Sequence, residues 1–281
     1  MRWFTIDQGV LALPRILPAH PTKIAMLNLL TVTPLLAVAA PIAPTPQDES
    51  SASESISYSY FGLLSETTFR DNETQLLPAS GVADAFSAEY LHDFGSGLFA
   101  YGRAAQGWES STQVLDFIPT TIEERTNALG LGLGYHVEPA DDWSLFGTVG
   151  FGTRSSSADW TLIDPAGVET AEVETDLSGL DLEVGARWRA TEQLEWFLSY
   201  SVSNPTGDLE VDDPALGAVS FDLEMQTRRL NLGLRAYFSP NLAGVIQLSQ
   251  GADERQFEFA GAKTDADLDI DVVRLGLNYF F

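Results

Sequence analysis

Charged residues of both signs occupy every second position of several apolar segments. In residues 180–189, apolar residues alternate with Asp181, Glu183, Arg187 and Arg189. Such a face carries too much charge to form the buried core of a soluble β-sandwich. Arginine forms fork-shaped pairs with carboxylates, and such pairs suit the interior of a narrow barrel. We therefore predict a polar network in a barrel lumen, composed of Glu89, Arg103, Asp181, Glu183, Arg187, Glu195, Arg229, Arg235 and Arg274.

This predicted network has two alternative consequences for the lumen. From residue 40 onward the chain has eleven arginines and a single lysine, Lys263. Charged side chains that cross a lumen of about ten strands would pair and largely fill it. We predict that they form a plug that stabilises the barrel. A narrow path for ions or small solutes is the alternative.

Histidines, the usual bases of hydrolytic enzymes, are few and poorly placed. Beyond residue 40 they are His92 and His136, both beside predicted short turns. Barrel enzymes need a base next to a nucleophile or carboxylate. No Asp-x-His pair or Gly-x-Ser-x-Gly motif is present. We predict no catalytic residues; a lipid-modifying or protease barrel is the less favoured alternative.

Acidic residues dominate the charge but form no recognisable binding motif. The net charge of −25 argues against a nucleic acid partner, because phosphate binding depends on clustered Lys and Arg. Asp208, Glu210, Asp212 and Asp213 offer oxygen ligands, but their spacing does not match the twelve-residue calcium loop. We predict a solvated loop there, with no metal and no cofactor.

The elements that would position these residues are β-strands. No stretch beyond residue 40 keeps a helical period, whereas alternation with period two recurs between clusters of Gly, Pro, Asp and Ser. Residues 273–281 place apolar residues from Val273 to Phe281 on one face and Arg274 and Asn278 on the other. Lipid outside and a polar interior explain this split, although a secreted β-sandwich also shows alternation.

Segment lengths predict an up-and-down antiparallel barrel. Ten strands fit best, with eight as the main alternative; they are expected near residues 56–64, 85–92, 98–108, 129–137, 143–153, 180–189, 194–202, 230–238, 242–250 and 273–281. Short connections are expected at 93–97, 138–142, 190–193 and 239–241, and long acidic loops near 66–80, 109–124, 155–174, 203–219 and 252–265. Tight turns on one side and long loops on the other are typical of outer-membrane barrels.

The N-terminal 54 residues are predicted to lie outside the barrel. Basic residues precede a short apolar run, 27–40, and Ala-Val-Ala at 37–39 fits a cleavage site for secretion. The chain has no cysteine, so no disulfide can form. The predicted domains are a signal peptide over 1–39, a disordered periplasmic leader over 40–54 and a barrel over 55–281.

Aromatic residues and one arginine suggest how the barrel sits in a membrane. Aromatic residues such as Tyr135, Trp188 and Tyr279 gather beside the short turns and form a candidate interfacial girdle, which places both termini in the periplasm. Arg228 shares the lipid-facing parity of its strand but lies at the opposite interface. We predict that Arg228 contacts a phosphate of the outer-leaflet glycolipid.

From about residue 56 to its end, the chain resembles the small bacterial outer-membrane barrels, the class of the OmpA transmembrane domain and the opacity-type surface proteins. The closing strand carries the resemblance, with alternating apolar residues that end in Tyr279 and Phe281. In that class this strand is the signal read by the barrel-assembly machinery. The resemblance implies outer-membrane lipid and glycolipid, the secretion machinery and the barrel-assembly machinery as partners. A structural or surface-interaction role is expected, with a small porin-like channel as the alternative.

Overall fold

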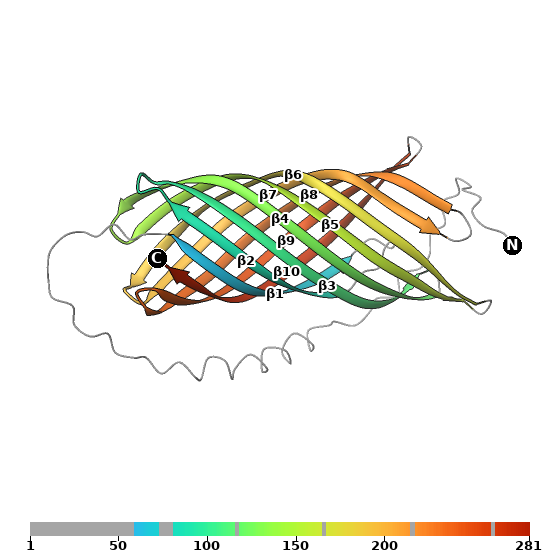
Figure 1. Cartoon of the computed structure of the whole chain (residues 1–281), viewed down its shortest axis with the longest axis horizontal. Coiled ribbons are helices and arrows are strands. Elements are labelled where there is room, and N and C mark those ends of the chain that lie inside the picture. Colours follow the sequence, from blue (N-terminus) through green and yellow to red (C-terminus); the bar gives the residue numbers. More distant parts are fainter. Residues whose placement is uncertain (1–58, 73–80, 116–117, 165–166, 214–216, 260–261) are drawn as a thin grey trace, which may run out of the picture. The chain divides into compact units, whose positions relative to one another are not determined.

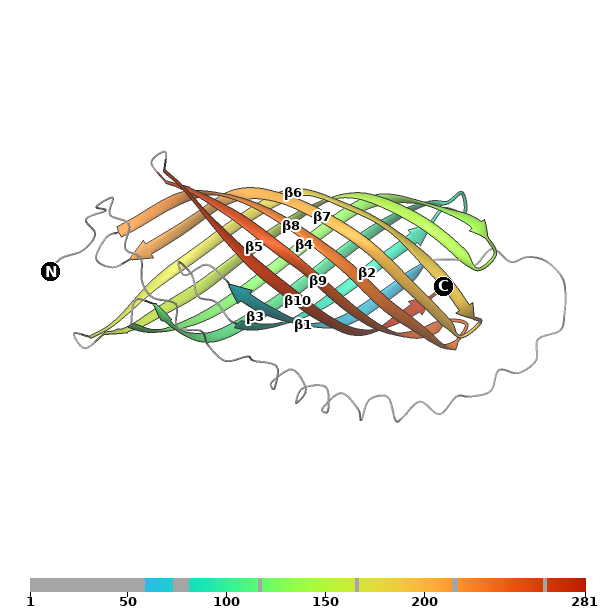
Figure 2. The same cartoon turned by 180° about the vertical axis from the view of Figure 1, so that it is seen from behind.

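A computed structural model describes residues 59–72, 81–115, 118–164, 167–213, 217–259 and 262–281. These residues form a closed β-barrel (Figures 1 and 2). The strands are β1 (Tyr60–Asn72), β2 (Gly81–Asp93), β3 (Leu98–Leu115), β4 (Ile118–Ala140), β5 (Trp143–Asp164), β6 (Gly167–Thr191), β7 (Leu194–Asp213), β8 (Gly217–Ser239), β9 (Leu242–Phe259) and β10 (Ala262–Phe280). No helix long and apolar enough to cross a membrane occurs in these ranges. The predicted signal peptide and leader lie outside the described residues.

Each strand pairs antiparallel with its neighbours in sequence, and β1 pairs with β10 to close the barrel. The prediction of an up-and-down barrel with ten strands is confirmed, and the eight-strand alternative is wrong. All four predicted short connections are found where expected. We call the end that holds these turns and the C-terminus the proximal end, and the opposite end the distal end. Figure 1 shows the C-terminus at the proximal end, where β1 begins.

Four of the five predicted long loops are mostly strand, and residues 66–72 of the remaining one belong to β1. For example, β6 begins at Gly167 and β7 continues to Asp213, so residues expected in loops belong to extended hairpins. Acidic residues explain the difference, because acidity by itself is typical of an exposed loop. In the structure, alternation continues through these residues with most of the carboxylates on the outward face.

An apolar belt surrounds the barrel near its proximal end. Its outward side chains are large and exposed to the surroundings; Leu131, for example, is 73% exposed and Val184 is 61% exposed. On β6 the belt runs from Trp188 to Leu180, about the nine residues with which a tilted strand crosses a membrane. A continuous apolar surface of this kind is stable only against lipid. The belt therefore marks the part of the barrel that lies in a bilayer.

Beyond the belt, the two faces of the strands exchange character. On β10 the outward face changes from Val273 to Asp271 and Asp269, while the inward face changes from Arg274 to Ile270, which is 2% exposed. On β6 to β10 the distal strand segments thus bury mostly apolar side chains inside and carry acidic ones outside, as a water-soluble barrel would. We call them the distal part.

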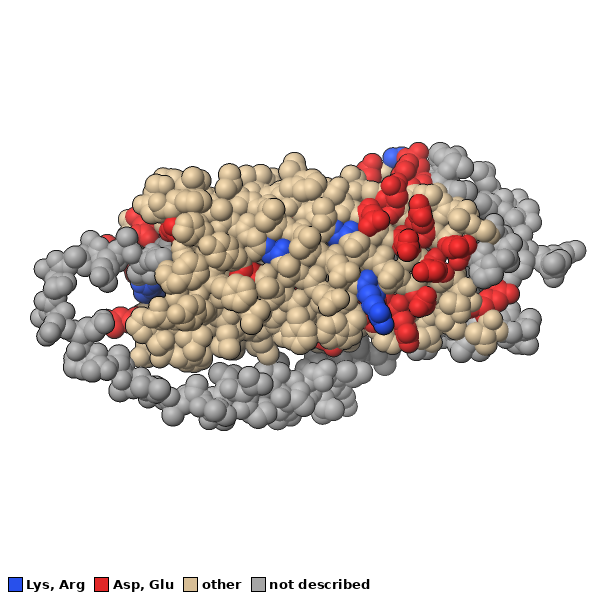
Figure 3. All heavy atoms as spheres, viewed as in Figure 1, with Lys and Arg blue, Asp and Glu red and all other residues tan. Residues whose placement is uncertain are grey.

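Carboxylates gather around the outside of the distal part. In Figure 3 most red side chains lie at the end of the barrel away from the C-terminus, while mostly uncharged residues cover its middle. The outward acidic residues of β6 to β10 are Glu172, Glu174, Asp176, Asp208, Glu210, Asp212, Asp222, Glu224, Glu254, Glu258, Asp265, Asp267, Asp269 and Asp271. We call this set the acidic collar.

Inside the barrel, aromatic rings lie over glycines of adjacent strands. The ring of Phe99 covers Gly134, and the ring of Phe197 covers Gly233 so closely that a Cβ there would lie 2.0 Å from its Cζ atom. A side chain at either glycine would displace the ring. These glycines therefore let aromatic residues lie flat across the narrow proximal lumen.

Candidate functional site: the barrel lumen

The lumen contains a cavity of about 510 Å³ lined by residues from the strands around the barrel. Three layers of side chains surround it. Aromatic and charged residues fill the proximal end, charged and hydroxyl residues line the middle, and an apolar cluster around Leu177, Leu223 and Met225 lies in the distal part.

The proximal layer is built around one buried ion pair. Glu195 and Arg235 are direct partners on β7 and β8, pair with each other, and are only 1% and 5% exposed. The Arg235 guanidinium lies 5.4 Å from the ring centroid of Tyr60, 5.8 Å from Phe197 and 5.5 Å from Phe280. These contacts are within the range of cation–π interactions. We call these five residues the proximal plug.

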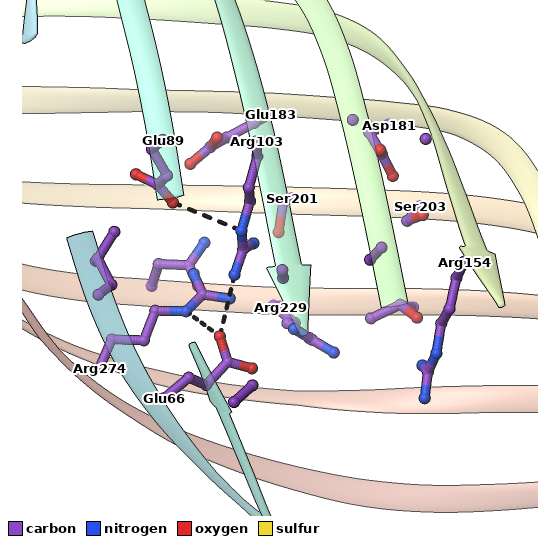
Figure 4. A pocket seen from close by; sticks show the side chains of 18 of the residues that line it. Glu66, Glu89, Arg103, Arg154, Asp181, Glu183, Ser201, Ser203, Arg229 and Arg274 are labelled. Atoms are coloured by element: carbon purple, nitrogen blue, oxygen red, sulfur yellow. Dashed lines mark hydrogen bonds and ion pairs between the residues drawn. The ribbon is translucent and has the colours of Figure 1, made fainter. Parts of the chain in front are cut away.

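The middle layer contains a second charged cluster, centred on Glu66 of β1 (Figure 4). Its Oε2 atom lies 2.5 Å from Arg274 Nε and 3.1 Å from Arg103 Nη2. The Nε atom of Arg103 lies 3.6 Å from Glu89 Oε1. Four strand residues from β1, β2, β3 and β10 therefore form a continuous network across one side of the lumen.

Three other charged residues of the middle layer lie outside these ion pairs. Among the described residues, Asp181, Glu183 and Arg229 form no ion pair, although all three line the cavity. The Nε atom of Arg229 is buried without a hydrogen-bond partner. In Figure 4 Arg229 lies beside the Glu66 cluster, and no dashed line reaches it. Arg187 lies with its guanidinium 4.8 Å from the ring centroid of Phe146.

The structure thus divides the nine predicted network residues into groups. The first group is Glu89, Arg103 and Arg274: Arg103 pairs with Glu89, and both arginines pair with Glu66. The second group is the ion pair of Glu195 and Arg235. Asp181, Glu183, Arg187 and Arg229 also face the cavity but belong to neither group.

The sequence prediction missed Glu66 and Asp253. Both were assigned to loops, yet Glu66 keeps the inward parity of Tyr60 and Leu64 on the same strand. Asp253 is 2% exposed, with Oδ2 3.8 Å from Arg255 and no hydrogen-bond partner at Oδ1. Continued alternation beyond the apolar belt was the signal that could have found them.

The remaining predicted residues lie on the outside or at the proximal end. Arg228 is outward, donates to Gln226 and pairs with Glu254 at 3.1 Å. Asp208, Glu210 and Asp212 belong to the outward face of strand β7, so the prediction of a loop there is wrong. No group of residues suited to a metal ion occurs in the part of the chain that the structure describes.

At the proximal end, His136 Nε2 lies 3.0 Å from Asp93 Oδ2, beside the turn between β2 and β3. His92 lies on the other face of β2, in contact with the rings of Tyr90 and Phe94. Tyr279 and Phe281 are exposed on the outward face of the closing strand, as predicted.

Comparison with known families agrees with this geometry. Residues 31–238, more than half of the chain, match the family described as outer membrane protein beta-barrel domain. The chain belongs to this family. It is therefore a protein of the bacterial outer membrane, and the apolar belt is its membrane-embedded surface. A search of curated proteins finds none that matches the chain.

Solved structures show similarity of fold. The outer membrane protease OmpT from Escherichia coli superposes with a TM-score of 0.51 at 10% identity, covering 82% of this chain and 100% of that chain. The β domain of the Bordetella autotransporter BrkA has a TM-score of 0.50 at 11% identity, covering 79% of this chain and 99% of that chain. At this low identity the likeness concerns the barrel alone.

Proposed function

We propose that this barrel has a structural or surface-interaction role, with its termini in the periplasm and its distal part outside the cell. The observation that carries the proposal is the proximal plug, which places a buried ion pair and three aromatic rings across the lumen. A barrel closed in this way stabilises itself but passes little solute. The distal part then serves as a rigid extension that presents the acidic collar above the lipid surface.

A non-enzymatic role is part of this proposal. The two histidines in the described ranges lie at the proximal end, away from the distal surface where the substrates of a surface enzyme would arrive. The similarity to OmpT, at 10% identity, concerns the fold. A small channel is the second candidate, because a cavity of about 510 Å³ lies above the plug.

Conductance separates the two candidates. The refolded protein, reconstituted in a planar lipid bilayer, is expected to give no steady single-channel steps, because the proximal plug blocks the lumen. Heat-modifiable migration on SDS gels first establishes that the barrel is folded. Regular steps of constant size from the folded protein would contradict the closed-barrel proposal and support the channel.

Arg228 remains our proposed contact for the outer-leaflet glycolipid. Arg228 is exposed at the distal edge of the apolar belt, where glycolipid phosphates would lie. On the outward face of its strand its neighbour on the proximal side is Leu230. Its pairing with Glu254 holds the guanidinium at this level. Arg228→Ala is expected to reduce glycolipid co-purification by about half or more, whereas Arg125→Ala on the outward face of β4 serves as the control. Unchanged glycolipid content would refute this contact.

A further inference from the structure

Three adjacent strands place unpaired opposite charges in one row of the lumen. On β6, β7 and β8, Glu183 is directly opposite Ser201, and Ser201 is directly opposite Arg229. Directly opposite residues on antiparallel strands have Cβ atoms about 5 Å apart, so the acid and the base are about 10 Å apart at Cβ. Between them the wall carries only a small hydroxyl side chain.

The next row repeats the acid and the hydroxyls. Asp181 is directly opposite Ser203, which is directly opposite Thr227. All six residues of the two rows line the cavity. The wall therefore has a carboxylate side on β6, a hydroxyl strip on β7 and a guanidinium on β8, visible in Figure 4 as Asp181, Glu183, Ser201, Ser203 and Arg229.

Within the described ranges no ion pair joins the charges of this wall, although Asp253 of β9 and Glu66 of β1 lie near enough to Arg229 to offset part of its charge. Arg103 and Arg274 share the carboxylate of Glu66, whereas Arg229 has no ion-pair partner among the described residues. The stem of Arg229 crosses Gly251, where a Cβ would lie 2.8 Å from its Cγ atom, and this glycine gives the stem room. Unpaired charge inside a narrow lumen is costly, and a ligand with complementary charges would remove that cost.

The cavity has a polar route toward the distal end. Its lining includes Glu109 on β3, Glu124 and Thr126 on β4, and Arg154 on β5, where it pairs with Glu124 at 3.6 Å. Most buried apolar residues of the distal part lie on the opposite strands, β6 to β10, and Ala158 of β5 is an exception. We therefore expect a polar molecule to approach the middle layer along β3 to β5 and to be stopped there by the proximal plug.

We propose that this wall binds small zwitterions, such as free amino acids and their ω-amino relatives. The carboxylate of the ligand pairs with Arg229, its ammonium group pairs with Glu183 and Asp181, and Ser201 and Ser203 provide hydrogen bonds between them. Both ligand charges are matched, so binding adds no net charge to the lumen. This inference goes beyond the proposed surface role and does not depend on whether the barrel conducts.

Calorimetric titration in non-ionic detergent tests the proposal with three matched probes: 4-aminobutyrate, butyrate and butylamine. The zwitterion is expected to bind at least about tenfold more tightly than either singly charged probe, because each charge-assisted contact contributes about a factor of ten or more. The proposal fails if 4-aminobutyrate does not bind, or binds no more tightly than butyrate and butylamine.

Variants identify the wall as the binding surface. Arg229→Gln is expected to weaken 4-aminobutyrate binding about tenfold, to the level of butylamine, and Glu183→Gln to weaken it to the level of butyrate. Arg228→Gln changes the adjacent outward residue and is expected to leave affinity unchanged. Equal affinities of the Arg228 and Arg229 variants would overturn the assignment.

A further variant keeps the test informative if a charge change prevents folding, as judged by heat-modifiable migration. Ser201→Leu keeps both charges but fills the space between them, and it is expected to weaken 4-aminobutyrate binding at least about tenfold. Unchanged affinity in a folded Ser201→Leu barrel would also overturn the proposal.

Discussion

Replacement of Glu66 by glutamine is expected to destabilise the folded barrel by about 3–5 kcal/mol, the usual cost of removing one partner from a buried ion pair. Glu66 is the shared acceptor of Arg274 at 2.5 Å and Arg103 at 3.1 Å. Without its charge, these two guanidiniums and Arg229 would face the same part of the lumen with Glu89 as the nearest carboxylate of the network. Denaturant unfolding in detergent, followed by heat-modifiable migration, measures the change.

An outward carboxylate provides the matched control for Glu66. Asp269→Asn removes a charge of the same sign from exposed strand β10 in the acidic collar. Its effect is expected within about 0.5 kcal/mol, because exposed substitutions away from packed or paired groups change stability little. Equal stability of the Glu66 and Asp269 variants would show that the Glu66 network does not support the barrel.

Removal of both charges of the proximal plug is expected to turn a silent barrel into a conducting one. In the double variant Glu195→Ala, Arg235→Ala, the two buried charges are removed together. Arg189, whose side chain is 23% exposed, loses its contact of 3.8 Å with Glu195 but keeps access to water, so the barrel is expected to fold. The rings of Tyr60, Phe197 and Phe280 lose the guanidinium on which they pack. Single-channel recording in planar bilayers is expected to change from no steps to discrete steps of constant size.

A second Arg–Glu pair outside the barrel supplies the control. Arg228 and Glu254 lie 3.1 Å apart on the outward faces of β8 and β9, so their double replacement by alanine removes the same two charges without touching the lumen. That variant is expected to stay silent. If the Glu195, Arg235 double variant folds and is also silent, the proximal plug is not the barrier to conduction.

The barrel itself was predictable from the sequence because its main signal is local. Alternation on each strand follows from lipid on one side and a polar lumen on the other, and the closing strand that ends in Tyr279 and Phe281 shows it most clearly. The short turns, such as the one between Thr191 and Leu194, were predictable because the alternation is interrupted there for only a few residues. These features give the strand number and the inward face of each strand in the apolar belt.

The length of the strands was not predicted, because hydropathy reverses where the membrane ends. Asp267, Asp269 and Asp271 are outward residues in water, where carboxylates are favourable, while Leu268 and Ile270 are buried between them. The alternation is the same as in the belt, with its two faces exchanged. Acidity alone favours a loop, whereas the apolar residues at every second position indicate a strand.

The ion-pair pattern of the lumen depends on the register and closure of the barrel. Glu66 is directly opposite Arg274, but the two residues are 208 positions apart in the chain. Arg103 reaches the same carboxylate from β3, with β2 lying between. Inward parity therefore predicted which residues face the lumen, whereas their partners became evident only from the closed sheet.

The exchange of faces on β6 to β10 also constrains how the barrel enters its membrane. With the termini in the periplasm, as proposed, the hairpins that contain these strands must carry the acidic collar through the hydrocarbon during insertion. On β10 alone this means translocating Asp265, Asp267, Asp269 and Asp271. Charges on the lipid side of a strand are unfavourable at the bilayer centre, so we expect this passage to have a high free-energy cost during insertion. After insertion, the same carboxylates oppose movement of the strands back through the hydrocarbon and so hold the barrel in the membrane.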